Sequence, residues 1–176
     1  MKKLSVIAKQ YSHGEIRVTH EQNLVLPHIK NSDLFSVWNK LRALKLATPN
    51  IGLITDTICC PGMDYCALAT ARSIPISQKI SQHFKDQSIQ DKIGNIKIKI
   101  SGCINACGHH HVGNIGILGL DRNGEESYQI SLGGSADEKT SIGKIVGPSF
   151  SEKELIKAIQ TIIAVSYTHL TLPTTY

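Results

Sequence analysis

The sequence lacks any long hydrophobic run. No apolar stretch approaches the ~20 residues that a membrane-spanning helix needs. At the N-terminus, two lysines are followed by only a few apolar residues before Lys9, which is too short for the core of a secretory signal peptide. The sequence therefore predicts no association with a membrane and a location in the cytoplasm.

Aromatic residues and clustered basic residues are also scarce. Aromatics make up only 5% of the 176 residues, and the lysines are spread along the chain instead of forming a basic run. A nucleic-acid surface usually shows a basic patch with interleaved aromatics, so no nucleic-acid partner is expected. The formal net charge of +5 is mild, although it also suits a polyanionic cofactor. The balance of 41% hydrophobic and 19% charged residues is typical of a globular protein.

Disulfide bonds are not expected either. The five cysteines are an odd number, and no signal peptide points to an oxidising compartment. Four of them form two pairs, with five residues between Cys60 and Cys66 and three between Cys103 and Cys107. Four thiolates from two separate loops can enclose one metal centre, and a cubane iron–sulfur cluster takes four cysteines.

The spacing of these pairs favours a cluster over other metal sites. Structural zinc sites usually pair cysteines with two to four residues between them, and the gap after Cys60 is longer. Neither a Cys-x-x-Cys-His haem-attachment motif nor a Cys-x-x-Cys-x-x-Cys ferredoxin motif is present. A zinc site and unrelated buried or free thiols stay open as alternative interpretations.

Apolar periodicity predicts an α+β chain. The elements expected before the loop at 47–52 are a helix, two strands and a helix, at 1–13, 14–19, 23–27 and 31–46. The strands expected after that loop lie at 53–58, 96–100, 115–120, 126–132 and 142–146, with a hairpin turn at 121–124. The later helices are expected at 65–71, around 75–84 and from a capping box formed by Ser151 and Glu154.

The last twelve residues differ from the rest of the chain. Residues 165–176 contain β-branched residues and Pro173, which are expected to interrupt the final helix. They also resemble the translation of a sequencing-library adapter. We therefore predict that this tail is not native and exclude it from the fold.

Two polar clusters have both a structural and a functional interpretation. Gln22 and Asn23 lie between the first two predicted strands, where they either build a hydrogen-bonded turn or approach a cofactor. His109, His110 and His111 follow the second cysteine pair. Side chains alternate in direction along an extended chain, so all three rings cannot bind one metal ion. One or two of the rings are expected to contact cofactor carboxylates or to cap the loop.

Several motifs, in this order along the chain, resemble the sirohaem and 4Fe-4S sulfite and nitrite reductase haemoproteins. They are the segments 19–24 and 60–62, the two cysteine pairs, and the segment 131–134. The resemblance runs from about Gly14 to about Ile163 and covers only the C-terminal half of such an enzyme. It implies a ferredoxin-like half-domain (β-β-α) at 1–47, followed at 53–164 by a mixed α/β domain that binds sirohaem and the cluster.

The resemblance also implies roles for individual residues. The cluster ligands would be Cys60, Cys66, Cys103 and Cys107, and Cys107 would in addition be the proximal ligand of the sirohaem iron. Further cofactor-binding residues would be Asn105, Gly108, His109, His110, Gln22 and Asn23. Cys59 is expected to face the core instead, because adjacent side chains on a strand point in opposite directions.

The reaction implied by the resemblance is the six-electron reduction of sulfite to sulfide, with nitrite as the other candidate substrate. Electrons would come from a flavoprotein or a ferredoxin and pass from the cluster through Cys107 to sirohaem. The basic residues that hold the anion in this family come largely from the missing N-terminal half. The chain is therefore expected to be a fragment without turnover of its own, and it holds no catalytic residue beyond the metallocentre. A stand-alone cluster- or zinc-binding module and a small electron-transfer protein without sirohaem are the alternative functions.

Overall fold

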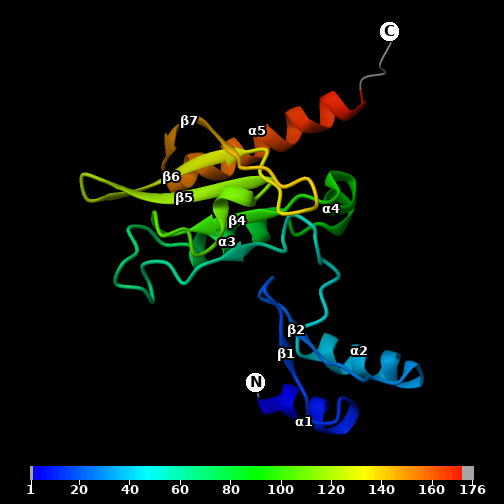
Figure 1. Ribbon diagram of the computed structural model, residues 1–176. Coiled ribbons are helices and arrows are strands. Elements are labelled where there is room, and N and C mark those ends of the chain that lie inside the picture. The colour runs from blue at the N-terminus through cyan, green and yellow to red at the C-terminus, as the bar shows by residue number, and fades with distance from the viewer. Residues whose placement is uncertain (1, 172–176) are drawn as a thin grey trace. The chain divides into compact units, whose positions relative to one another are not determined.

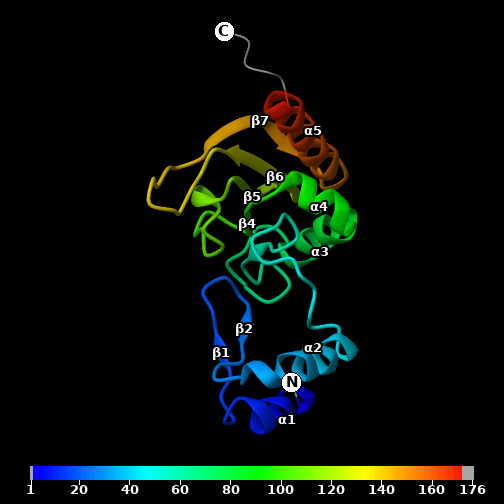
Figure 2. The same ribbon diagram turned by 90° about the vertical axis from the view of Figure 1, so that its right-hand side faces the viewer.

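The computed structural model describes residues 2–171, and their side chains as far as Ser166. The chain divides into two compact units, Met1–Pro49 and Asn50–Tyr176 (Figures 1 and 2). Within residues 2–171 there is no helix whose length and apolar character would let it cross a membrane.

The first unit holds two helices and a small sheet. Its elements are α1 (Lys2–Tyr11), β1 (Arg17–Val18), β2 (Leu24–Val25), the short 3-10 helix η1 (Asn31–Asp33) and α2 (Leu34–Ala43). The two strands pair antiparallel, as in the predicted strand–strand–helix unit, although each is shorter than predicted.

The two helices of this unit bury unequal apolar faces. On α1, Leu4, Ile7 and Ala8 are buried, and their spacing of three and four residues places them on one face. On α2 only Val37 is buried, and Trp38 is 42% exposed.

The second unit is a five-stranded mixed sheet, with the order β3-β4-β5-β6-β7. Its strands are β3 (Ile58–Cys59), β4 (Ile98–Ser101), β5 (Ile115–Arg122), β6 (Glu125–Leu132) and β7 (Lys144–Phe150). The first three run parallel, and β6 and β7 continue antiparallel. The β5–β6 hairpin turns at Asn123 and Gly124, which both have positive φ, so the predicted hairpin is confirmed.

Helices cover one face of this sheet. They are α3 (Ile74–His83), α4 (Gln87–Ile93) and α5 (Glu152–Thr171), and η2 (His110–Val112) is a short 3-10 turn. Figures 1 and 2 both show α3 and α5 on the same side of the strands. The buried core contains Ile76 and Ile80 from α3, Leu155 and Ile159 from α5, and Ile117 from the centre of the sheet. Strand alternation sends the intervening residues to the opposite face of the sheet.

Three predicted elements differ from the structure. The strand expected at 53–58 is reduced to β3, and 50–57 forms turns. The helix expected at 65–71 is wrong, because this segment is an irregular loop. The prediction that the last helix is interrupted at Val165 is also wrong, since α5 continues to Thr171. A β-branched residue lowers the stability of a helix by only about 0.5 kcal/mol, and the hydrogen bonds within the helix outweigh this cost. The remaining residues of the predicted tail, 172–176, lie outside the described part of the chain.

The start of α5 follows its predicted capping box. The Glu154 carboxylate accepts hydrogen bonds from the Ser151 backbone N–H at 2.9 Å and from the Ser151 hydroxyl at 2.7 Å. These bonds lower the pKa of Glu154, the largest cause being the Ser151 hydroxyl. The helix that covers β6 and β7 therefore begins where the sequence predicts.

Candidate metal centre

The two cysteine pairs begin at the same edge of the sheet. Cys60 directly follows β3, and Cys103 comes two residues after β4. Because β3 and β4 are parallel, their carboxyl ends meet at one edge. The backbone N–H of Cys60 donates to the Ile100 carbonyl at 3.2 Å, which extends the pairing one residue beyond β3. Cys60 and Cys103 are both buried at this edge.

The two cysteine loops are tied to each other through Gly102. The Gly102 carbonyl accepts hydrogen bonds from the backbone N–H groups of Thr70 and Ala71, at 2.9 and 3.0 Å, and from the Thr70 hydroxyl at 3.1 Å. These long-range bonds replace the local ones that a helix at 65–71 would have made. A β-carbon on Gly102 would lie 2.7 Å from the Ala71 carbonyl oxygen, so only glycine fits where the loops cross.

A cluster of charged side chains holds the first cysteine loop against the hairpin. The Arg72 guanidinium pairs with Glu126 on β6 and, at 3.1 Å, with Asp64 in the loop. The Tyr128 hydroxyl donates to the Arg72 carbonyl at 3.1 Å and lies 3.0 Å from the Glu126 carboxylate. Burial and the Glu126 carboxylate raise the pKa of Tyr128. Sequence reasoning missed this cluster, because its members are separated by up to 64 positions and share no motif.

The Cys60 sulfur lies between two potential hydrogen-bond donors. The backbone N–H of Gly102 donates to it at 3.1 Å, and the Ser73 hydroxyl oxygen is 3.3 Å away. Cys59, its neighbour, instead packs against the hydrophobic core, as the strand alternation predicts. Burial raises the pKa of the Cys59 thiol, which favours its neutral form.

The second cysteine loop closes tightly on the end of β4. The Gly108 backbone N–H donates to the Ser101 hydroxyl at 3.1 Å, and a β-carbon on Gly108 would lie only 1.8 Å from the Ile100 carbonyl oxygen. Asn105 and Cys107 are exposed at the tip of this loop, and the Cys107 sulfur is 3.9 Å from the Asn105 carbonyl oxygen. The loop therefore presents Cys107 outward while Cys103 stays buried.

The four paired cysteines supply the type of donor that a cubane cluster takes. Among the side chains that the structure describes, as far as Ser166, no three of His, Cys, Asp or Glu converge closely enough to hold one ion. A structural zinc ion needs four ligands around one point. A cubane cluster binds each cysteine to a different iron, so its four sulfurs stand apart around a larger body. Four free thiols on two loops, with a backbone N–H already directed at one of them, provide the ligand chemistry that such a cluster requires.

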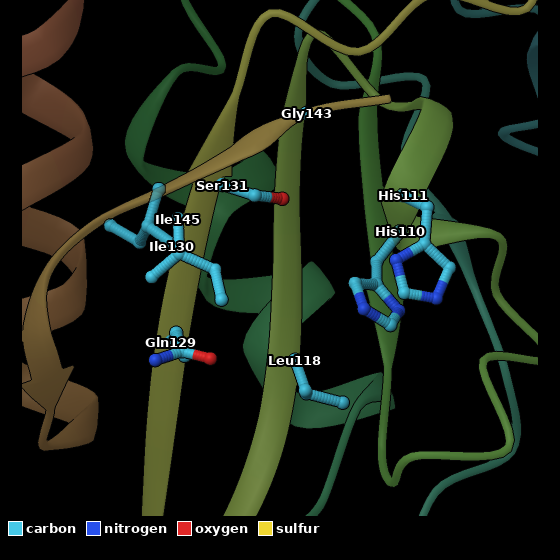
Figure 3. A pocket seen from close by; sticks show the side chains of 8 residues that line it. All are labelled: His110, His111, Leu118, Gln129, Ile130, Ser131, Gly143 and Ile145. Carbon is cyan, nitrogen blue, oxygen red and sulfur yellow. The ribbon is translucent and has the colours of Figure 1, made fainter. Parts of the chain in front are cut away.

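The three histidines have different surroundings. His109 is exposed, with a positive φ of 55°, whereas His110 is buried and stacks near His111, with ring centroids 3.9 Å apart. His110 and His111 line a cavity of about 130 Å³ on the sheet face opposite the helices (Figure 3). The Ser131 hydroxyl points from β6 toward these rings. Among the described residues, neither the Ser131 hydroxyl nor His110 Nδ1 has a hydrogen-bond partner.

The buried position of His110 makes its neutral form the stable one. Burial, and secondarily the neighbouring His111, lower the pKa of His110 to about 4, from an ordinary value of 6.5. The stability that comes from keeping this ring neutral is complete above pH 6.5 and is lost as the pH falls toward 4. Each pKa unit corresponds to about 1.4 kcal/mol, so the free energy of unfolding falls by an amount on the order of 3 kcal/mol.

A substitution at His110 is expected to reduce the acid sensitivity of the metal-free chain. The His110→Gln variant cannot take up this proton, so its free energy of unfolding should fall by about 3 kcal/mol less than that of the unsubstituted chain between pH 7 and pH 4. Urea unfolding at the two pH values measures the difference. The exposed neighbour provides the control, because His109→Gln should leave the pH dependence unchanged. An equal effect from both variants would contradict the assignment to His110.

Gln22 and Asn23 lie in the first unit and build the turn between β1 and β2. The Asn23 backbone N–H donates to the Thr19 hydroxyl at 3.0 Å, and the Gln22 N–H donates to the Thr19 carbonyl at 3.1 Å. Gln22 has a positive φ of 63°, as turn residues often do. The structural interpretation of this cluster is therefore confirmed, and its approach to a cofactor stays a prediction.

Comparison with known proteins identifies the family. The family model described as the nitrite and sulphite reductase 4Fe-4S domain matches residues 52–168, which is more than half of the chain. The chain belongs to the nitrite and sulphite reductase family. The ferredoxin-like half-domain of these reductases matches residues 1–44. Both matches confirm the family and the fold class that the sequence motifs predict.

Individual relatives include reductases for both anions. The chloroplastic ferredoxin–nitrite reductase of Spinacia oleracea is 28% identical over 170 residues, covering 93% of this chain and 28% of the relative. The haemoprotein beta-component of the NADPH sulfite reductase of Bacillus licheniformis is 26% identical over 166 residues, covering 91% of this chain and 28% of the relative. The chain therefore spans less than a third of the length of these reductases.

A solved structure shows the same fold. The Mycobacterium tuberculosis NirA protein matches with a TM-score of 0.79 and 22% identity, over 99% of this chain and 33% of that one. The family assignment makes this chain part of an oxidoreductase family. The description of the matched domain names a 4Fe-4S cluster, in agreement with the cluster expected from the motifs.

Proposed function

We propose that this chain forms the cofactor-holding part of a sirohaem-dependent sulfite or nitrite reductase. Its cluster ligands are Cys60, Cys66, Cys103 and Cys107. The observation that carries this proposal is the pairing of β3 with β4, which brings two cysteine loops to one edge of the sheet and buries Cys60 and Cys103 there. The domain limits that go with it are 1–47 and 53–164, and the non-native origin of 165–176 rests on sequence alone.

Within this proposal the four cysteines differ in exposure, and Cys66 is intermediate between the buried and the exposed ones. Cys60 and Cys103 are buried against the sheet, so they anchor the cluster to the rigid part of the fold. Cys107 is exposed at its loop tip, where its sulfur is accessible to a second group. We assign it the bridging position between cluster and sirohaem. When bound, the two cofactors supply the one-electron steps that a six-electron reduction of the anion requires.

Further cofactor contacts in the proposal come from the same loop, and Gln22 and Asn23 of the first unit stay predicted contacts on sequence grounds. Gly108 keeps the backbone close to β4, and Asn105, His109 and His110 flank Cys107. An imidazole that donates a hydrogen bond to a carboxylate stabilises that charge, so the exposed His109 ring suits a carboxylate of sirohaem. His110 is buried and its neutral form is the stable one, so we assign it a role in supporting the loop from the inside.

Substrate and electron donor are proposed at the level of the family. This chain is 28% identical to a nitrite reductase and 26% identical to a sulfite reductase. The two identities are too similar to indicate which anion is the substrate. The particular residues within and beside the cysteine motifs favour sulfite as the proposed substrate. One of these relatives is named for ferredoxin and the other for NADPH, which supports a ferredoxin or a flavoprotein as the donor. The basic residues that hold the anion would come from another part of the full-length enzyme, so we expect no turnover from these 176 residues alone.

The bridging role of Cys107 is tested by the magnetic coupling between the two iron centres. In the chain loaded with cluster and sirohaem, Mössbauer spectra should show coupling between the sirohaem iron and the cluster irons. The Cys107→Ser variant should lose this coupling, because the shared sulfur is replaced. The matched control is Cys59→Ser, which alters a thiol of the core and should keep the coupled spectrum. Coupling that persists in Cys107→Ser would contradict the bridge.

A further inference from the structure

The hydroxyl of Ser73 has an unusual place in the fold. Ser73 is the N-cap residue of α3, where a serine hydroxyl normally accepts a hydrogen bond from a backbone N–H of the first turn. Here the hydroxyl makes no such bond. It is completely buried and lies 3.3 Å from the Cys60 sulfur instead. The hydroxyl has therefore exchanged the usual capping bond for a contact with sulfur.

The surroundings of Ser73 hold its hydroxyl in this position. Pro75 in the first turn of α3 has no backbone N–H, which removes one capping donor. On the other side, the first cysteine loop passes so close that a β-carbon on Gly62 would lie 2.4 Å from the Ser73 oxygen. The Ser73 carbonyl accepts the Ser77 N–H at 2.9 Å, which fixes its backbone in the helix start. A buried hydroxyl that is fixed in this way needs a partner, and the Cys60 sulfur lies within hydrogen-bond distance of it.

We infer that Ser73 tunes the cluster by donating its hydroxyl hydrogen bond to the Cys60 thiolate. The inference rests on the proposed function, in which Cys60 is a cluster ligand. A thiolate carries no proton, so the hydroxyl must be the donor in that state. With the Gly102 N–H at 3.1 Å, one ligand sulfur then accepts two hydrogen bonds. Ser73 touches no substrate and acts through Cys60, as a positioning and tuning residue.

The expected consequence is a higher reduction potential. Reduction adds an electron to the cluster, and part of the added charge resides on the cysteine sulfurs. A hydrogen bond to such a sulfur stabilises the reduced form more than the oxidised form. Because the site is buried, water cannot replace this bond when the hydroxyl is removed. Loss of the hydroxyl should therefore make the cluster harder to reduce.

The test compares three serine variants of the chain loaded with iron and sulfide. Ser73→Ala removes the donor and Ser73→Thr retains a hydroxyl. Ser127→Ala removes a buried hydroxyl of β6 that has no hydrogen-bond partner among the described residues, so it is a matched control. An EPR-monitored redox titration gives the potential of each cluster. Resonance Raman spectra in H₂O and D₂O give the shift of the iron–sulfur bands that exchangeable protons cause.

For Ser73→Ala, we expect the ratio of reduced to oxidised cluster to fall about fivefold at a given potential, which is a shift of about −40 mV at 59 mV per tenfold change. The deuterium shift should decrease but not vanish, because the Gly102 N–H remains. Ser73→Thr and Ser127→Ala should keep the original potential. A potential in Ser73→Ala equal to that in Ser127→Ala would overturn the inference.

The proposed function and this inference fail in different ways. If Cys60→Ala loses its iron while Ser73→Ala keeps the original potential, Cys60 is a ligand and only the role of Ser73 is refuted. If Cys60→Ala retains the full iron content, Cys60 is not a ligand, and the proposed ligand set and the role of Ser73 are refuted together.

Discussion

Replacing Cys60 with alanine is expected to lower the iron content of the reconstituted chain from about four atoms to below about one. The sulfur of Cys60 is buried at the end of β3, so no neighbouring water or exposed side chain can take its place as ligand. Its contacts with the Gly102 N–H and Ser73 also fix its position before any metal binds. Iron and acid-labile sulfide analysis, with the visible absorption of the cluster, measure the loss.

The adjacent residue supplies the control for this experiment. Cys59→Ala is the same chemical change one position earlier, on a side chain that packs against the hydrophobic core. We expect it to cost about 1 kcal/mol of stability and to leave the iron content unchanged. Equal iron loss from both variants would mean that the change acts through the fold of β3 and not through a ligand.

Replacing Gly108 with alanine is expected to destabilise the second unit by about 3 kcal/mol or more. The new methyl group would lie 1.8 Å from the Ile100 carbonyl oxygen, far inside van der Waals contact. That carbonyl cannot move away freely, because it accepts the Cys60 N–H at 3.2 Å and belongs to β4, an interior strand of the sheet. The cysteine loop must then detach from β4, and the Gly108 N–H loses its bond to Ser101. Urea unfolding of the metal-free chain gives the change in stability.

A second glycine tests whether this effect is local. Gly143→Ala is the matched control, because its β-carbon would lie 3.2 Å from the Ser131 hydroxyl oxygen and 3.3 Å from the Ser131 β-carbon, contacts that a small shift of the neighbours relieves. Its cost should stay below about 1 kcal/mol. If Gly108→Ala is as stable as Gly143→Ala, the closure of the loop on β4 does not contribute to the fold as described.

The features that could be predicted from sequence are those with local causes. Asn123-Gly124 builds the two-residue hairpin turn because both residues tolerate positive φ. Ser151 and Glu154 cap α5 through bonds three residues apart. The cysteine spacing was informative for the same reason, since each pair lies within one loop.

The features that could not be predicted depend on residues far apart in the sequence. The segment 65–71 has helical periodicity, yet its N–H groups at Thr70 and Ala71 bond to Gly102, more than thirty positions later. Nothing within a local window signals that competition. The contact of Ser73 with the Cys60 sulfur was missed similarly, because a serine before a helix predicts a cap. The buried state of His110 depends on the sheet face formed by β5 and β6, which the histidine triplet itself does not encode.

The measurement that tests the central claim most directly is anaerobic reconstitution of the 176-residue chain with iron, sulfide and sirohaem, followed by metal analysis and an absorption spectrum. The account predicts about four cluster irons and one sirohaem iron per chain, with broad cluster absorption and a sharp macrocycle band. A colourless protein that retains only zinc would contradict it, because the four cysteines would then serve a single-ion site.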